Sequence, residues 1–169
     1  GYDMLPLPGS DGQFDLESVA VETVIGGATG GMHRPQEAYL GDPNDPFSIA
    51  CLRRTSVSPD GYYDVVAHGN PTHVQVATPN GLQLVDGQGL AERISSQRNY
   101  TPGTPVRLVS CSTGADPSGV AQQVANNLNA PVRAPSDIVW SDWDGSTVVG
   151  TAQNGVGTWN DFTPQGPVP

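Results

Sequence analysis

The sequence predicts a single domain of mixed α/β fold, in which helices flank a mostly parallel central sheet. The chain has 169 residues, which is enough to build one hydrophobic core. Segments typical of strands and of helices alternate between residues 62 and 137, the pattern of a parallel sheet with helical crossovers. The 21 glycines and 16 prolines indicate long, turn-rich edges around this centre.

The amino-terminal third has few clear elements. Residues 1–17 are rich in proline, glycine and aspartate, so we interpret them as an irregular linker or lead-in, and residues 18–169 as one α/β catalytic domain. Residues 18–25 alternate apolar and polar side chains and predict a strand. Residues 26–46 are broken by glycine and proline and predict a long loop. Residues 47–57, which contain Cys51, predict a second strand.

The middle of the chain is more regular. Residues 62–67 are β-rich and end at His68-Gly69. Two short alternating runs, 73–77 and 82–85, are separated by Pro-Asn-Gly and predict a β-hairpin excursion. A short amphipathic helix is expected to begin near Asp86.

A second strand–helix–strand unit follows. Residues 105–110 predict a buried strand that ends at Cys111, and a tight turn over 112–114 follows it. Asp116-Pro117 is typical of a helix start, with a capping carboxylate before a proline. Residues 131–134 predict another strand, and residues 138–169, which hold all three tryptophans, predict a closing C-terminal hairpin and a proline-rich end.

This order brings reactive side chains to one edge of the sheet. In open α/β sheets ligands bind beyond the carboxyl ends of the strands, and His68, Cys111 and Asp137 all sit at such ends. A thiol becomes a nucleophile when a neighbouring base takes its proton, and amides at Gly69 and Cys111 would form an oxyanion hole. Alone, each residue is more typical of an inert core or turn position; together they favour Cys111 as nucleophile and His68 as base.

Composition restricts the partners and cofactors. The net charge is −10, with 17 acidic residues against seven basic ones, so the surface repels phosphate backbones and anionic membranes. We therefore expect no nucleic-acid partner, and the chain has no apolar run long enough to span a membrane. Three histidines and two cysteines lack the paired spacings of zinc sites, so we expect no metal or other cofactor. His73 is a second candidate imidazole, whereas His33 has no comparable partner in the sequence.

Two motifs resemble a known group of enzymes. The run VVAHG at residues 65–69, followed by LVSCSTG at 108–114, resembles the caspase-like cysteine peptidases, which include gingipains and CHAT domains. The resemblance implies a caspase-like fold with His68 as general base, Cys111 as nucleophile and Gly69 in the oxyanion hole. It also implies substrate binding near Asp137, with Ser136 and Trp140 beside it, and cleavage after Arg or Lys. The alternative for Asp137 is a turn residue that caps local amides.

A longer stretch resembles bacterial toxin domains. Residues 62–162 are similar to C-terminal domains of polymorphic toxins of the Rhs/YD-repeat type from actinobacteria, on the runs YYDVVAHG, PVRLVSCSTG, AQQVANNLNAPVRAPSD and GTWNDF. This resemblance implies a secreted domain delivered as part of a larger precursor. Residues 1–3 show no signal peptide, in keeping with release from such a precursor. We expect a monomer that acts on a protein or peptide substrate, or on its own precursor, and a cognate immunity protein would be a further partner.

Three other functions stay open. The same Cys–His dyad serves a deamidase or an acyltransferase, because these reactions also pass through a thioester. Another possibility is an NAD-cleaving toxin. The glycine-rich run at 26–31 argues against it, because no convincing helix follows this run. A non-enzymatic binding domain would instead join Cys51 and Cys111 in a disulfide.

Overall fold

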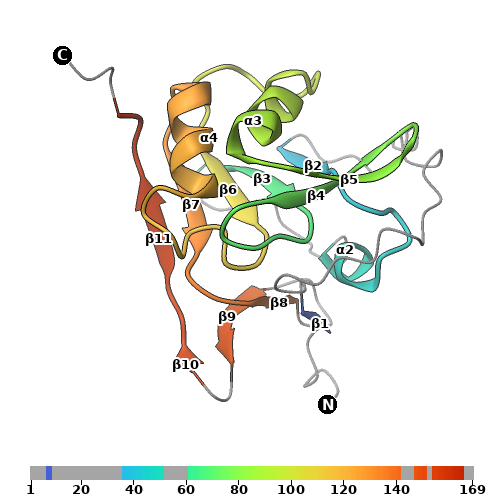
Figure 1. The fold of residues 1–169 in the computed structure, drawn as a ribbon, viewed down its shortest axis with the longest axis vertical. Helices are drawn as coiled ribbons and strands as arrows, with labels where there is room; N and C mark the ends of the chain where they lie inside the picture. Colours follow the sequence, from blue (N-terminus) through green and yellow to red (C-terminus); the bar gives the residue numbers. More distant parts are fainter. Residues whose placement is uncertain (1–6, 9–35, 52–60, 142–146, 152–153, 166–169) are drawn as a thin grey trace.

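The computed structural model describes residues 7–8, 36–51, 61–141, 147–151 and 154–165, and these form a mixed α/β fold around a five-stranded mixed sheet (Figure 1). The strand order is β11-β7-β6-β3-β2. Four strands are parallel, and the edge strand β11 runs antiparallel to β7. The bounds are β2 (Glu37–Tyr39), β3 (Tyr63–Val66), β6 (Val106–Val109), β7 (Val132–Pro135) and β11 (Trp159–Phe162).

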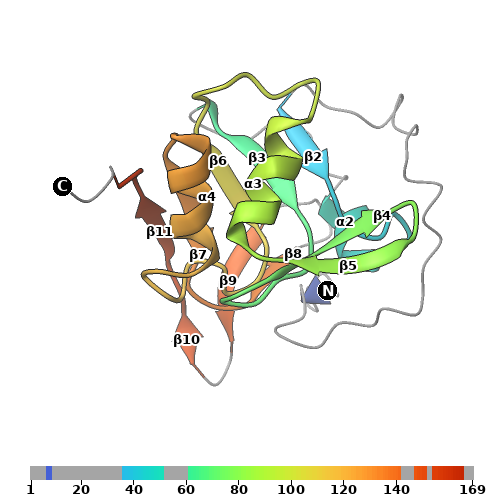
Figure 2. The ribbon, with the colours of Figure 1, turned by 45° about the horizontal axis from the view of Figure 1, so that its top comes forward.

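Helices α3 (Gly87–Ser95) and α4 (Val120–Leu128) pack side by side over one face of this sheet (Figure 2). Their apolar sides meet alternate strand residues in the larger hydrophobic core, where Leu90, Ile94 and Leu108 are fully buried. Burying a side chain of this size contributes about 1.5–3 kcal/mol. The helices are amphipathic as the sequence predicts, and α3 begins at the predicted cap, since Asp86 accepts a hydrogen bond from the Gly89 amide.

A smaller apolar layer lies on the opposite face. It contains Phe47 and Cys51 of α2 (Pro46–Cys51), together with Val66, Val109, Cys111, Val139 and Val149. A second sheet of order β1-β8-β9-β10 contributes to this layer, and α2 contacts its strands β1 and β8. Its strands are β1 (Leu7–Pro8), β8 (Val139–Ser141), β9 (Thr147–Thr151) and β10 (Gly155–Val156). Leu7 and Pro8, in the segment interpreted as a lead-in, therefore pair with β8.

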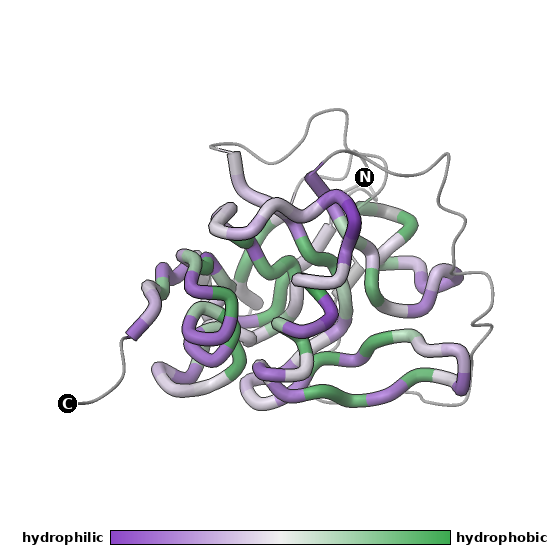
Figure 3. Tube along the Cα trace, turned by 90° about the horizontal axis from the view of Figure 1, so that it is seen from above, coloured by the Kyte–Doolittle hydropathy of each residue, from purple (hydrophilic) through white to green (hydrophobic). Residues whose placement is uncertain are grey.

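The predicted hairpin excursion is confirmed as β4 (Val74–Thr78) and β5 (Gly81–Val85). Gly81 has a φ of +116°, which an L side chain rarely adopts. Hydrophobic and hydrophilic residues alternate along both strands (Figure 3). The hairpin is attached to the main sheet, because Val74 forms a bridge with Gly69 and the Ala77 amide donates to Leu40 O at 2.7 Å.

Two predictions for the amino-terminal third are wrong. Residues 46–51 form helix α2 instead of the start of a strand, because Asp45 caps the Ser48 amide at 2.9 Å and Pro46 suits a first helical turn. The expected loop over 26–46 contains the edge strand β2, whose Glu37 accepts a hydrogen bond from the Tyr39 hydroxyl. The strand expected at 18–25 lies outside the described residues.

Two further points refine the outline. Helix α4 begins at Val120 and not at Pro117, because Asp116 instead binds the Ser118 amide in a preceding turn. The tail returns as β8, β9 and β10, which form antiparallel pairs, and as β11, which completes the main sheet. None of the helices in the described ranges is long and apolar enough to cross a membrane.

Candidate functional site

His68 and Cys111 follow neighbouring parallel strands at equivalent positions. Val66 of β3 pairs with Val109 of β6, and the Ala67 amide still bonds Val109 O at 3.4 Å. His68 and Cys111 each lie two residues beyond this pair. Side chains alternate along a strand, so both point to the face that carries Val66 and Val109, opposite α3 and α4. The structure therefore brings the two predicted residues to the same edge and the same face of the sheet.

Asp45 holds the His68 ring from the loop before α2. His68 Nε2 lies 2.7 Å from Asp45 Oδ1, and the two side chains are 16% and 14% exposed. The other carboxylate oxygen of Asp45 caps the Ser48 amide, and the Phe47 ring centroid lies 5.8 Å from that of His68. Asp45 is not among the site residues that the sequence predicts. The Asp-Pro pair at 45–46 is a helix-start signal that could have indicated an ordered carboxylate here.

Cys111 is completely buried between β6 and the start of β8. The Val139 amide donates to its sulfur at 3.3 Å, and the sulfur lies 3.8 Å from Val139 O. Its exposed fraction is 0%, and Phe47 and Cys51 belong to the same apolar layer. A donor aimed at the sulfur favours negative charge there, whereas the apolar layer keeps solvent away.

Gly69 occupies a position where only glycine fits. A Cβ at this residue would lie 2.2 Å from Ser110 Oγ and 2.9 Å from Thr113 Cγ2. Its antiparallel bridge with Val74 is flanked by two backbone hydrogen bonds. One runs from the Asn70 amide to His73 O, and the other from the Gln75 amide to His68 O. The N–H and C=O of Gly69 therefore point away from β4, toward the segment that contains Cys111. This direction suits the predicted contribution of Gly69 to an oxyanion hole.

The turn after Cys111 is fixed on several sides. Ser112 has a left-handed φ of 57°, and its amide donates to Asp137 O at 3.0 Å. The Thr113 carbonyl accepts the Ala121 amide of α4 at 3.1 Å. Left-handed backbone at a residue other than glycine stores local strain, which packed surroundings must maintain.

A protein-family model matches the part of the chain that contains the candidate site. The model described as "Domain of unknown function (DUF8616)" matches residues 36–149. The chain belongs to this family. The DUF8616 segment runs from β2 into β9 and includes Asp45, His68 and Cys111. No curated protein and no solved structure matches the chain.

The three predicted substrate-binding residues also fall inside the DUF8616 segment. The Asp137 carboxylate accepts hydrogen bonds from the Ile138 amide at 2.7 Å and from Asn154 Nδ2 at 3.0 Å, which are contacts of a turn aspartate. Ser136 Oγ accepts the Thr158 amide at 2.9 Å, and the half-buried Trp140 indole donates to Gly150 O. The Asp137 carbonyl contacts the turn after Cys111, so these residues border the site, and their role in specificity stays a prediction.

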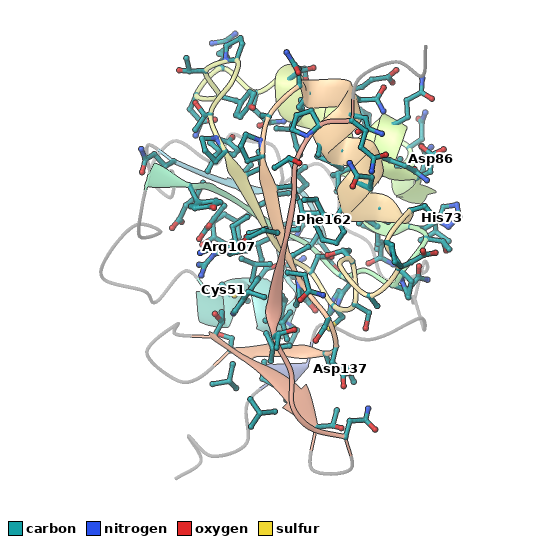
Figure 4. All side chains as sticks on the ribbon, turned by 90° about the vertical axis from the view of Figure 1, so that its left-hand side faces the viewer. Cys51, His73, Asp86, Arg107, Asp137 and Phe162 are labelled. Carbon is teal, nitrogen blue, oxygen red and sulfur yellow. The ribbon has the colours of Figure 1, made fainter. Side chains whose placement is uncertain are left out.

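His73, the second candidate imidazole, lies on the opposite side of the sheet from the candidate site. His73 Nδ1 lies 2.9 Å from Thr72 Oγ1, and Figure 4 shows His73 on the side of α3 and α4, whereas Cys51 and Arg107 lie on the other side. His33 lies outside the described residues. Among the described residues, no three His, Cys, Asp or Glu side chains are grouped closely enough to hold a metal ion.

Two tyrosines in the larger core have raised pKa values. Burial raises the pKa of Tyr63 far above its usual value, and its hydroxyl donates to Asn99 Oδ1 at 2.6 Å. Burial also raises the pKa of Tyr100, whose ring meets that of Tyr63 edge to face. Tyr63 belongs to the face under α3 and α4, so these groups are structural and lie away from the candidate site.

Proposed function

We propose that this protein is a toxin-type thiol hydrolase, a cysteine peptidase that acts on a protein substrate or on its own larger secreted precursor. The observation that carries the proposal is the pairing of β3 and β6. Two adjacent parallel strands end in an imidazole held by a carboxylate and in a thiol, at equivalent positions and on one face. We also propose that the sheet is of the caspase-like type, because that group carries a strand that ends in His-Gly and a later strand that ends in the nucleophilic Cys.

The proposed reaction uses the two nitrogens of His68 differently. When Nε2–H donates to Asp45, Nδ1 carries the lone pair that takes the proton from Cys111. The sulfur then attacks the substrate carbonyl carbon, and amide N–H groups at Gly69 and Cys111 stabilise the oxyanion. The imidazolium returns its proton to the leaving amine as the C–N bond breaks. Water then hydrolyses the thioester, which restores the thiol.

The site is closed in this structure. The Cys111 thiol is 0% exposed beneath the layer that contains Phe47 of α2, Val139 of β8 and Val149 of β9. A substrate therefore reaches the sulfur only after this layer opens. Local opening of a small apolar layer requires less free energy than global unfolding. Latency of this kind agrees with a domain that is released from a precursor.

Site-specific labelling tests the proposal. The native full chain is treated with an arginyl peptide chloromethyl ketone, and the modified residue is mapped by mass spectrometry. We expect a label at Cys111, no label in Cys111→Ala, and much slower labelling in His68→Ala. Cys51→Ala is the matched control, because Cys51 is equally buried in the same layer, and it should retain the label at Cys111.

Two results would contradict the dyad. Labelling of Cys51 in preference to Cys111 would exclude Cys111 as the nucleophile. Unchanged labelling in His68→Ala would show that the imidazole does not take the proton from the thiol.

A further inference from the structure

Gln75 lies beside His68 on strand β4. The Gln75 amide donates to His68 O at 2.9 Å, and Gly69 forms a bridge with Val74, so Gln75 stands directly opposite His68 across the two segments. Val74 and Val76 point into the larger core. Because side chains alternate along a strand, Gln75 points to the opposite face, as His68 does.

Three side chains from different segments therefore form a row at the carboxyl end of the sheet. Gln75 flanks His68 on one side, and Cys111 flanks it on the other. The backbone carbonyl oxygen of Gln75 lies 3.7 Å from the point that a Cβ on Gly41 would occupy, so β4 adjoins the loop that leads to Asp45. The row thus begins on β4 and ends at the candidate nucleophile.

The side-chain nitrogen of Gln75 is buried without a hydrogen-bond partner among the described residues. Gln75 is only 3% exposed, and its Nε2 atom is inaccessible to solvent. Gln122 is a useful comparison, since it is 8% exposed and its Nε2 donates to Asn126 Oδ1 at 2.9 Å and to Thr163 O at 2.8 Å. A buried amide normally finds such partners, and one that does not calls for a ligand or a catalytic explanation.

A second polar atom near Gly69 is in the same state. Ser110 Oγ is buried and has no hydrogen-bond partner in the described part of the chain, and it lies against the backbone of Gly69. Ser110 points to the face of α3 and α4, whereas Gln75 points to the face of Cys111. Of these two side chains, Gln75 is the one whose unpartnered donor lies on the side where the thiol reacts.

We propose that Gln75 is a substrate-binding residue that completes the oxyanion hole. This inference rests on the thiol chemistry proposed above. Gln75 Nε2–H donates a hydrogen bond to the substrate carbonyl oxygen, which gains negative charge when Cys111 sulfur bonds to the carbon. No bond to Gln75 forms or breaks. The chemistry recognised is an acyl group, as in a peptide bond or an amide side chain.

The test separates binding of an oxyanion from reactivity of the thiol. A peptide aldehyde adds to the thiol and forms a hemithioacetal, whose oxygen occupies the oxyanion position. Methyl methanethiosulfonate reacts with the same sulfur and forms no such oxygen. In Gln75→Met we expect aldehyde affinity to fall by about 100-fold, the usual effect of losing one oxyanion donor, with an unchanged methanethiosulfonate rate.

The Tm of Gln75→Met is a second measurement. If Gln75 had only a structural role, its replacement would lower Tm. Because the Gln75 donor is unsatisfied, its replacement by Met should leave Tm unchanged or raise it. The matched control is Gln83→Met on the neighbouring strand β5, where Gln83 is exposed, and it should change neither reaction.

Each outcome decides something different. Unchanged aldehyde affinity in Gln75→Met overturns the role of Gln75 and leaves the thiol chemistry intact. A lowered Tm with unchanged affinity identifies Gln75 as a packing residue and overturns the inference too. If Cys111 of the unaltered chain reacts with neither reagent, the thiol hydrolase proposal fails, and the role of Gln75 fails with it.

Discussion

On the sheet face that carries Cys111, the two ends of the parallel strands differ in how their buried polar side chains are paired. At the amino end of the parallel strands, a row of charged residues crosses the sheet, one from each strand in register: Glu37, Asp64, Arg107, Arg133 and Asp161. Arg107 binds the fully buried Asp64 through two hydrogen bonds of 2.9 and 2.7 Å, and Trp159 lies 5.1 Å from its guanidinium carbon.

At the carboxyl end, Gln75, His68 and Cys111 form a row that is built differently. His68 is held by Asp45 from outside the sheet, and the Gln75 amide has an unpartnered donor in the part of the chain that the structure describes. A polar group that is buried and paired contributes to the sheet, because it fixes the register of its strands. A polar group that is buried and left unsatisfied reduces stability and is kept where chemistry needs it.

The largest expected effect breaks the paired end. Arg107→Met leaves the Asp64 carboxylate buried without its guanidinium, which should lower the free energy of unfolding by about 3–5 kcal/mol in urea titrations. Arg133→Met is the control, because its partner Asp161 is 61% exposed, and it should cost less than about 1 kcal/mol. Equal losses in both variants would show that burial of the pair has no special effect.

A smaller effect should come from loosening the layer over the thiol. Phe47→Leu weakens the packing above Cys111, and a loss of about 1.4 kcal/mol in that layer would raise the open population tenfold. We therefore expect Cys111 in the folded protein to react about tenfold faster with methyl methanethiosulfonate. Phe162→Leu, which changes the packing of the larger core on the other face, should leave this rate unaltered. A rate that does not respond to Phe47→Leu would mean that substrate enters by another route.

The smallest effect concerns the carboxylate behind His68. Asp45→Asn keeps a good helix cap but replaces a charge-assisted hydrogen bond with a neutral one of about half the strength, so Cys111 labelling should slow by about fivefold. Tm should stay the same, and the pH profile of labelling should change. Asp42→Asn in the same loop is the control, since Asp42 caps the Asn44 amide. An identical pH profile in Asp45→Asn would exclude a positioning role for Asp45.

The sequence was informative where its patterns were periodic. The β-rich run at 62–67 and the buried-looking run at 105–110 predicted β3 and β6, and the alternating runs around the Pro-Asn-Gly turn predicted the hairpin of β4 and β5. The edge strand β2 has only three residues and includes a polar Glu37, so no periodicity could reveal it. The apolar run at 47–51 suits a strand or a helix equally well, and the contact of Asp45 with the Ser48 amide decided for α2.

The candidate site was predictable in part for the same reason. His68 and Cys111 end strands that the sequence revealed, so their common edge could be predicted. Asp45 and Gln75 reach the site through a loop and through the return of a hairpin, and their places depend on pairings between distant segments. Gln75 also looks like an ordinary outward residue of an alternating strand, and only its burial and its missing partner distinguish it.

The tight fit between Gly69 and Ser110 has a consequence for the family as a whole. A methyl group at position 69 would overlap the serine hydroxyl, and a bulkier residue at 110 would press on the glycine backbone. We therefore expect the residues at positions 69 and 110 to covary among homologues. A homologue that acquired alanine at the first would need a smaller group, or a shifted turn, at the second.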